Sequence, residues 1–314
     1  MTEEELNNIV SLPPLPAAVG IAKRPANIEW LKASDGAKLG YRFWQGSNDS
    51  PVVLYLHGIE GHSQWFENTA SVLNERGLTV YAPDRRGCGM NGQSRGHIRN
   101  YRILLADLES QLRLIRRQHR GNPVFLMANC WSAKLAAILA QVDYKSTDLS
   151  LLPPFAGLIL TSPAIYTRID LSLPTKLKIA FSWLRGAQGQ MQLWPIPLTT
   201  TMLTNNPDYL DYLQKDPLRL TNVTTSFLVQ TFLLSLKAKE VAKNIKIPTL
   251  ILQAGVDEIV NIEKLENWYE EIPAADKAMR VFPEVDHSLD FDRAWFKEYT
   301  HMLCQWIAGR AQPP

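Results

Sequence analysis

The feature that most constrains the fold of this chain is a series of short, uninterrupted apolar runs. Runs of this kind, unlike alternating apolar and polar residues, are typical of strands that are buried on both faces of a parallel sheet. The clearest are Val52–Leu56, Leu78–Ala82, Val124–Met127, Gly157–Leu160 and Thr249–Leu252. A weaker run, Ala278–Phe282, lies nearer the end of the chain. We therefore expect a mostly parallel central sheet.

Helical patterns separate these runs. Apolar residues recur at roughly helical spacing in three segments, Tyr101–Gln118, Trp131–Gln141 and Phe291–Ala308. In front of the first run, Ile28–Leu31 and Leu39–Phe43 alternate apolar and polar residues on either side of a turn, which predicts an antiparallel hairpin. Alternation of strand and helix is typical of an α/β sheet with helices on both faces.

The alternation is interrupted once, between about Ile165 and Asn244. That segment shows helix-like patterns but no convincing strand, and it is too long for an ordinary loop. We interpret it as a helical cap inserted between two core strands. Near the start of the chain, prolines predict an arm that lies over another part of the molecule. The predicted parts are an arm at 1–25, an α/β core at 26–164 and 245–310, and a cap at 165–244.

The composition excludes several classes of protein. Hydrophobic residues make up 46% and charged residues 20%, as in soluble globular proteins. The formal net charge is +2 with no long run of either sign, so we expect no nucleic-acid partner. No apolar stretch is long enough to span a bilayer, and the acidic start, Met1–Glu5, lacks the basic region of a signal peptide. These features predict a cytoplasmic protein without an integral membrane segment, and they leave the oligomeric state open.

The cysteines and most histidines show no metal-binding pattern. The three cysteines, Cys88, Cys130 and Cys304, are widely separated and form no C-x-x-C pair. Neither a disulfide framework nor a zinc site is therefore expected. The same holds for the histidines that lie outside the motifs described below, His97, His119 and His301. We expect no metal and no cofactor, and we interpret Cys88 and Cys304 as structural.

The most informative stretch follows the run Val124–Met127 and reads Ala128-Asn129-Cys130-Trp131-Ser132-Ala133. In α/β sheets, ligands bind beyond the carboxyl ends of the strands. A strand that turns sharply into a helix can present one side chain there, provided that the residues two before and two after it are small. Ala128 and Ser132 meet this requirement. The spacing is that of the G-x-S-x-G nucleophile elbow, with both glycines replaced and Cys130 at the serine position.

Three further motifs accompany this elbow, and together they resemble the α/β-hydrolases. The branch they resemble most is that of the monoacylglycerol lipases and lysophospholipases, of the serine aminopeptidase S33 type. The resemblance runs from about Ala26 to Ala308 and implies an α/β-hydrolase fold, with a mostly parallel central sheet flanked by helices and a helical cap inserted between two core strands. The motifs are the HG-x-x-x-HS loop at His57–Ser63, the D-x-x-G-x-G turn at Asp84–Gly89 and a frequent cap motif at Asp216–Leu218.

The resemblance also implies a catalytic triad. The family's acid follows the strand after the cap, where Asp257 stands, and its histidine follows the last strand, where His287 stands. Cys130 would attack a carbonyl carbon, His287 would move the proton, and Asp257 would hold the imidazole. The backbone N–H groups of Ile59 and Trp131 would bind the oxyanion. We attribute the carboxyl groups near the histidine, those of Asp286, Asp290 and Asp292, to solvation or helix capping.

These residues predict a hydrolase that cleaves an ester or thioester of an apolar acyl substrate through an acyl-cysteine intermediate. A thiol beside a histidine at the start of a helix has a lowered pKa, which favours the reactive thiolate. Two alternatives stay open. An acyltransferase or cyclase would pass the same acyl group to an amine, alcohol or thiol, and a binding protein on this fold would catalyse nothing.

The cap is rich in large apolar residues, most of which we expect to pack against the core. Some should face the space above Cys130, because the cap lies over the elbow in this architecture, and an apolar roof favours an apolar substrate. The expected partner is therefore a small-molecule acyl substrate. The residues predicted to contact it are His62 in the loop after the first run and Trp183, Trp194 and Phe227 in the cap.

Overall fold

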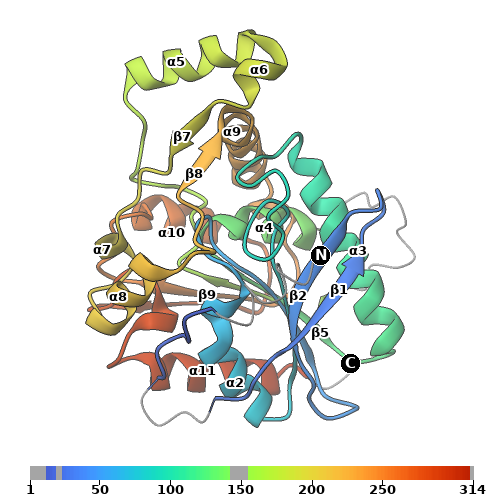
Figure 1. Ribbon diagram of the computed structural model, residues 1–314. Helices are drawn as coiled ribbons and strands as arrows, with labels where there is room; N and C mark the ends of the chain where they lie inside the picture. The colour runs from blue at the N-terminus through green and yellow to red at the C-terminus, as the bar shows by residue number, and fades with distance from the viewer. Residues whose placement is uncertain (1–11, 19–22, 142–154, 312–314) are drawn as a thin grey trace.

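The computed structural model describes residues 12–18, 23–141 and 155–311. An eight-stranded sheet runs through it in the order β1-β2-β4-β3-β5-β6-β9-β10 (Figure 1). Its strands are β1 (Asn27–Lys32), β2 (Lys38–Trp44), β3 (Val52–Leu56), β4 (Thr79–Pro83), β5 (Val124–Asn129), β6 (Gly157–Thr161), β9 (Thr249–Ala254) and β10 (Lys277–Phe282).

The sheet has the predicted mixture of pairings. β1 and β2 form the expected antiparallel hairpin, and β2 also pairs antiparallel with β4. All other neighbours, from β4 through to β10, are parallel. Every residue of β3, β6 and β9 is buried, which explains their uninterrupted apolar runs. β10 lies at the edge and is only partly covered, so its run is the weakest.

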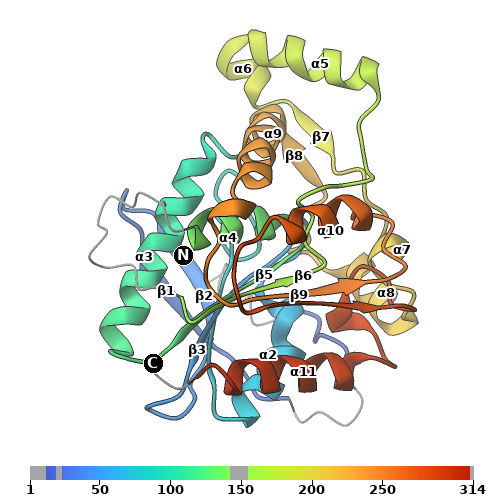
Figure 2. The ribbon, with the colours of Figure 1, turned by 180° about the vertical axis from the view of Figure 1, so that it is seen from behind.

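Helices cover both faces of the sheet, as the alternation predicted (Figure 2). The apolar core accordingly divides into two clusters, one on each face. On one face lie α3 (Tyr101–Gln118), α4 (Ala133–Ala140) and α10 (Ile262–Glu270), and on the other lie α2 (Glu67–Glu75) and α11 (Phe296–Ala308).

The last helix begins later than the sequence predicted. Helical spacing suggested a start at Phe291, but Leu289–Phe291 form a separate 3-10 turn and α11 begins at Phe296. Asp292 lies between the two and accepts a hydrogen bond from the backbone N–H of Trp295. The turn matters for the site, because it begins two residues after His287.

The segment between β6 and β9, residues 165–244, projects beyond the carboxyl edge of the sheet, and we refer to it as the cap (Figures 1 and 2). The prediction that it contains no strand was wrong, because β7 and β8 pair antiparallel. Each is only three residues long, too short to stand out as a run. The elements of the cap are α5 (Leu173–Leu184), α6 (Gly186–Gln190), β7 (Leu193–Pro195), α7 (Thr200–Leu203), α8 (Pro207–Lys215), β8 (Asn222–Thr224) and α9 (Thr225–Glu240).

The described part of the N-terminal arm packs between the core and the cap. Leu15 is buried in a third apolar cluster, which includes Leu203 and Leu213 of the cap. The side-chain amides of Gln64 and Asn68, on the core, donate hydrogen bonds to carbonyl groups of the arm. The arm therefore helps to hold α7 and α8 against the core.

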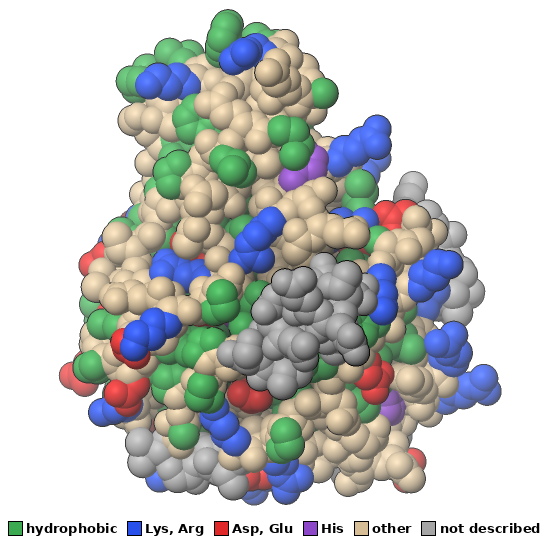
Figure 3. Space-filling view, viewed as in Figure 1, with side chains coloured by type: hydrophobic (Ala, Val, Ile, Leu, Met, Phe, Trp, Pro, Cys, Tyr) green, Lys and Arg blue, Asp and Glu red, His purple; other side chains and the backbone are tan. Residues whose placement is uncertain are grey.

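The outer end of the cap presents apolar side chains to the surroundings. On α5, Leu173, Leu177, Phe181 and Leu184 are between 62% and 82% exposed. Hydrophobic side chains are visible over this projecting end in Figure 3. Across the described residues, no helix combines the length and the apolar character needed to cross a membrane.

Candidate active site

Cys130 lies at the sharp turn between β5 and α4. Its φ is +51°, in the left-handed region, which costs a residue with a Cβ atom roughly 1–2 kcal/mol. Residues 130–132 form one 3-10 turn before the helix, and the hydroxyl of Ser132 donates a hydrogen bond to the carbonyl of His57. The turn therefore has the strained geometry of a nucleophile elbow.

His287 and Asp257 come together on the neighbouring loops. His287 Nδ1 lies 2.8 Å from Asp257 Oδ2. Oδ1 of the same carboxylate accepts hydrogen bonds from the backbone N–H groups of Ile259, at 2.8 Å, and Val260, at 2.9 Å. In the part of the chain that the structure describes, His287 Nε2 makes no hydrogen bond. The carboxylate thus fixes one ring nitrogen and leaves the other available.

Cys130, His287 and Asp257 shift one another's pKa. Burial raises the pKa of the Cys130 thiol, but the charge of His287, with a smaller contribution from Lys134, brings it below its ordinary value. Burial lowers the pKa of His287, while Cys130 and Asp257 outweigh this and raise it to about 10. Asp257 also has a lowered pKa, because His287 and several hydrogen bonds outweigh the effect of burial. The shifts of Cys130 and His287 both act in the direction that stabilises a thiolate beside an imidazolium.

Two backbone N–H groups flank the elbow. Trp131 opens the turn after Cys130, where N–H groups have no partner within the helix. Ile59 follows Gly58, whose backbone lies so close to the elbow that an added Cβ atom would be 3.2 Å from the Cβ of Cys130. The two residues predicted to bind an oxyanion, Ile59 and Trp131, therefore belong to two separate segments that meet at the elbow.

His57 and Arg85 hold the loop that carries Ile59. The backbone N–H of Arg85 donates to His57 Nε2 at 2.8 Å. The guanidinium of Arg85 donates to the carbonyls of Gly58 and Ile59, at 3.1 and 2.7 Å. Burial and the nearby Arg85 lower the pKa of His57 to about 3, so its imidazole is neutral and accepts this bond.

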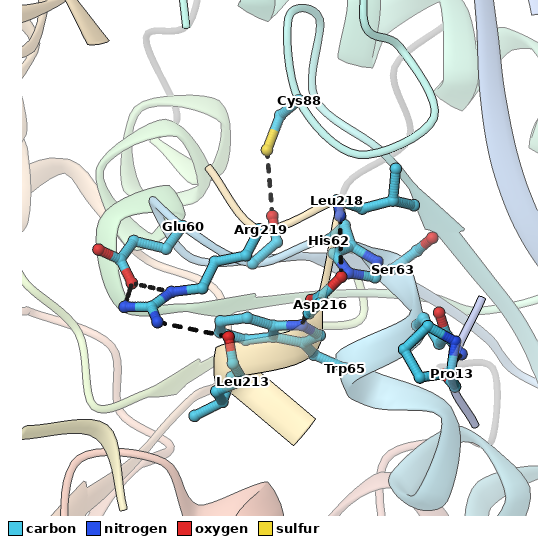
Figure 4. A network of polar contacts seen from close by, with 12 residues as sticks. Pro13, Glu60, His62, Ser63, Trp65, Cys88, Leu213, Asp216, Leu218 and Arg219 are labelled. Atoms are coloured by element: carbon cyan, nitrogen blue, oxygen red, sulfur yellow. Dashed lines mark hydrogen bonds and ion pairs between the residues drawn. The ribbon is translucent and has the colours of Figure 1, made fainter. Parts of the chain in front are cut away.

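The far end of the same loop is joined to the cap (Figure 4). His62 Nε2 lies 2.8 Å from Asp216 Oδ2, and the indole N–H of Trp65 donates to the same oxygen at 2.7 Å. Glu60 pairs with the guanidinium of Arg219 at 2.7 Å. The side chain of His62 is fully buried against Asp216. This residue, predicted to contact the substrate, therefore connects the loop to the cap.

A narrow cavity, with about 20 Å³ of free space for water-sized groups, lies beside Cys130. Core and cap both contribute apolar side chains to its wall, and polar side chains line the rest, among them Tyr55, Glu60, Asn129, Ser288 and Asp290. None of the four predicted substrate contacts lines it. The lining residues used below are Tyr55, Ile59, Glu60, Trp65, Cys130, Leu198, Leu203, His287, Asp290 and Phe291.

The three predicted cap contacts lie elsewhere. Phe227 is buried and stacks on Trp131, with ring centroids 5.5 Å apart. The indole N–H of Trp194 donates to the hydroxyl of Thr225 at 2.8 Å, and Trp183 lies on the outer helix α5. Apolar composition indicated a roof over the site but could not show which side chains face inward.

For Asp290, the expectation of a solvated or helix-capping carboxyl was wrong. Of the three acids near the histidine, Asp292 does cap the turn before α11, but Asp290 is only 6% exposed and faces the cavity. Its spacing, three residues after His287, was the available signal. Tyr55 was also missed, since a tyrosine within a buried strand looks like any other core residue.

The remaining cysteines lie outside the cavity. Cys88 is buried and its thiol donates to the carbonyl of Gly61, while Cys304 is half-buried on α11. Burial raises the pKa of both thiols. Within the described ranges, no group of three or more His, Cys, Asp or Glu side chains is arranged to hold a metal ion.

Comparison with known proteins gives a consistent result. The model of the family described as "Serine aminopeptidase, S33" matches residues 47–294. Monoglyceride lipase of Rattus norvegicus is 22% identical over 307 residues, which cover 94% of this chain and 97% of that protein. A soluble variant of monoglyceride lipase from Saccharomyces cerevisiae superposes with a TM-score of 0.77 at 20% identity, over 96% of this chain and 100% of that one. Monoacylglycerol lipase from Paleococcus ferrophilus superposes with a TM-score of 0.74 at 21% identity, over 87% of this chain and 100% of that one. These structural matches establish the α/β-hydrolase fold.

Proposed function

The chain belongs to the serine aminopeptidase S33 family and is an ester-hydrolysing α/β-hydrolase, and from this premise we propose that it acts through an acyl-cysteine intermediate. The substrate is an ester or thioester of an apolar acyl group. The observation that carries the proposal is the presence of Cys130 at a strained elbow, in one cavity with His287, whose ring is held by Asp257. The monoglyceride lipases among the relatives support the type of bond, and the residue at position 130 supports a thiol nucleophile.

In the first half of the reaction, the thiolate of Cys130 attacks the carbonyl carbon, and the carbonyl oxygen takes up the electron pair. The N–H groups of Ile59 and Trp131 donate to this oxyanion, each contributing about 3–4 kcal/mol to the transition state. As the bond to the leaving group breaks, imidazolium His287 gives it a proton. The products are the free alcohol or thiol and a thioester on Cys130.

In the second half, His287 Nε2 takes a proton from water, and the resulting hydroxide adds to the thioester. The thiolate leaves, the carboxylic acid is released, and the thiolate–imidazolium pair is restored. Asp257 stabilises the imidazolium and holds its tautomer through both halves. Transfer to an amine would use the same intermediate with a different nucleophile in this step.

The cavity wall supports an apolar acyl group. Trp65 and Phe291 come from the core, and Leu198 and Leu203 come from the cap. A pocket of this kind binds through burial of apolar surface, with a few polar groups that set orientation. Leu198 and Leu203 close the cavity from the cap side, so changes there should alter acyl preference more than the chemical step.

The test is intact-protein mass spectrometry after incubation with a panel of p-nitrophenyl esters and acyl thioesters. We expect an acyl adduct that maps to Cys130, that is absent in Cys130→Ala and that persists in the matched control Cys304→Ser. Clearance of the adduct by water alone identifies a hydrolase, whereas clearance that requires an added amine identifies an acyltransferase. If no donor forms an adduct and iodoacetamide leaves Cys130 unmodified at neutral pH, the proposal is wrong and the non-catalytic binding protein is favoured.

A further inference from the structure

Two carboxyl groups line the cavity beside Cys130, and of these Glu60 is paired with Arg219, whereas Asp290 has no role in the proposed reaction. Asp290 is 6% exposed and lines this cavity. Its Oδ1 accepts hydrogen bonds from the hydroxyls of Thr69 and Tyr299, at 2.5 and 3.3 Å. Apart from its own backbone N–H, no other group in the described residues donates to this carboxylate. One oxygen is thus held by the protein, and the other is left for whatever occupies the cavity.

Asp290 has no positive partner among the described side chains. The cavity wall contains no Lys or Arg, and the nearby Arg219 is paired with Glu60. The imidazolium of His287 is balanced by Asp257 and the thiolate of Cys130. Buried carboxylates in proteins are ordinarily paired with a cation or become protonated. Burial raises the pKa of Asp290 to about 6, which still leaves it mostly ionised at neutral pH.

A second polar group lies in the same cavity. Tyr55, on β3, lines the wall, and its hydroxyl makes no hydrogen bond to any residue that the structure describes. Its ring stacks on Phe66 with centroids 3.6 Å apart, which fixes its position. Burial and the nearby Asp290 and Cys130 raise the pKa of Tyr55, so it remains a neutral phenol whose oxygen can accept a hydrogen bond.

Both open groups therefore suit one ligand chemistry. A primary ammonium carries three N–H donors and a positive charge, so it can donate to both oxygens at once and neutralise the buried carboxylate. A hydroxyl has one proton to donate and no charge, so it satisfies Asp290 less well. The surrounding Trp65, Leu203 and Phe291 would contact the carbon atoms that carry the amine.

We propose that Asp290 and Tyr55 form a subsite for a primary ammonium group of the substrate, beside the carbonyl that Cys130 attacks. The preferred ester or thioester accordingly carries an amine within a few bonds of the reacting carbonyl. This inference rests on the proposed function for the chemical step, while the binding of the ammonium group depends only on the cavity.

The test measures protection of Cys130 from iodoacetamide, a neutral reagent, in the full-length protein at neutral pH. Alkylation rates are followed by mass spectrometry with ethylammonium chloride, with ethanol, and with tetramethylammonium chloride, which has charge but no N–H group, all at one ionic strength. We expect saturable protection by ethylammonium alone. Asp290→Asn should raise its half-protecting concentration by roughly 10–100-fold, and Tyr55→Phe by roughly 2–10-fold. In the control variant Asp286→Asn, on the same loop, ethylammonium should protect Cys130 as it does in the wild type.

Two results would overturn the proposal. Equal protection by ethanol would mean that the subsite binds hydroxyl groups, and equal protection of Asp290→Asn would mean that this carboxyl is structural. Failure of the proposed function is a separate result, since Cys130 would then react slowly with no ligand present. In that case the shift in melting temperature on addition of ethylammonium, compared between wild type and Tyr55→Phe, decides the question without the thiol.

Discussion

The core and the cap each supply one side of the cavity beside Cys130, and the two sides differ in chemistry. On the core side, Cys130, His287, Asp257 and Asp290 place strained backbone and buried charge at the ends of strands. On the cap side, the described lining residues are Leu198 and Leu203. Of the eleven large apolar side chains that are exposed in the described ranges, all but Ile28 and Val256 belong to the cap.

The core side therefore carries the charged groups of the proposed reaction, and the cap side carries the apolar surface that would select the substrate. Charges interact strongly in a buried setting only where the protein holds them in place, and the sheet provides that rigidity. The cap contributes apolar surface, whose energy depends on area and tolerates rearrangement. The two sides meet at polar joints, His62 with Asp216 and Glu60 with Arg219, so the cap can also affect the position of the loop that carries Ile59.

The largest effect is expected from a substitution that removes a charge on the core side. Asp257→Asn keeps the shape of the side chain but cannot stabilise the imidazolium of His287, so activity on an ester should fall roughly 10³–10⁴-fold. The pKa of His287 should also fall, which slows alkylation of Cys130 by iodoacetamide at neutral pH. Asp286→Asn is the matched control and should keep activity within a few-fold. Similar losses in both variants would mean that the loop, and not the carboxylate, is what matters.

The next effect is on stability, and it concerns Asp290. Burial raises its pKa to about 6, above its ordinary value of 3.8, so the folded protein binds this proton more tightly than the unfolded chain. The free energy of unfolding therefore falls as pH rises from about 4 to about 6 and stays low above that, a difference of about 3 kcal/mol. Asp290→Asn should accordingly stabilise the protein by up to about 3 kcal/mol at neutral pH, and far less at pH of about 4.

Urea unfolding of wild type and Asp290→Asn at both pH values measures this. Thr69→Val, which removes a donor to the carboxylate, is a useful companion and should destabilise most at neutral pH. If Asp290→Asn is less stable at both pH values, the bonds from Thr69 and Tyr299 outweigh the cost of burial. The carboxyl would then be part of the scaffold.

A smaller effect tests the strain at the elbow. At φ of +51°, glycine relieves the clash that a Cβ atom causes, although it loses more backbone entropy on folding. Cys130→Gly should therefore be more stable than Cys130→Ala by about 0.5–1 kcal/mol, with both variants inactive. Ala140→Gly, at the end of α4, should instead destabilise, because its backbone is helical. Equal stabilities of the two Cys130 variants, measured by chemical unfolding, would contradict strain at this position.

The sequence allowed the core to be predicted better than the cap, for a physical reason. Strands such as β3 and β9 are buried on both faces, so every residue is apolar and the run is visible. β7 and β8 have three residues each, and β7 is largely exposed, so no pattern distinguishes them from a loop. The turn at Leu289–Phe291 carries too few residues to show a period, which is why α11 was expected to start early.

The same reason applies to the site. Cys130, Asp257 and His287 each follow a strand, so their positions in the sequence indicated that they meet. The cavity wall depends instead on how the cap lies over the elbow. Apolar composition pointed to Trp183 and Trp194, which lie away from the cavity, and gave no sign of Leu198 or Leu203.

The smallest expected effect comes from the outer face of the cap. Leu177 and Phe181 on α5 are 62% and 66% exposed, so replacing both with serine removes little buried surface and should change the free energy of unfolding by less than about 0.5 kcal/mol. Leu203→Ala, in the cavity roof, is the contrasting variant and should cost about 2–5 kcal/mol. Activity on a short-chain ester should be unchanged by the α5 substitutions. If the serine substitutions on α5 lower the free energy of unfolding by an amount that depends on protein concentration, a second copy of the chain covers this face. The outer face of the cap would then be buried, as the core is.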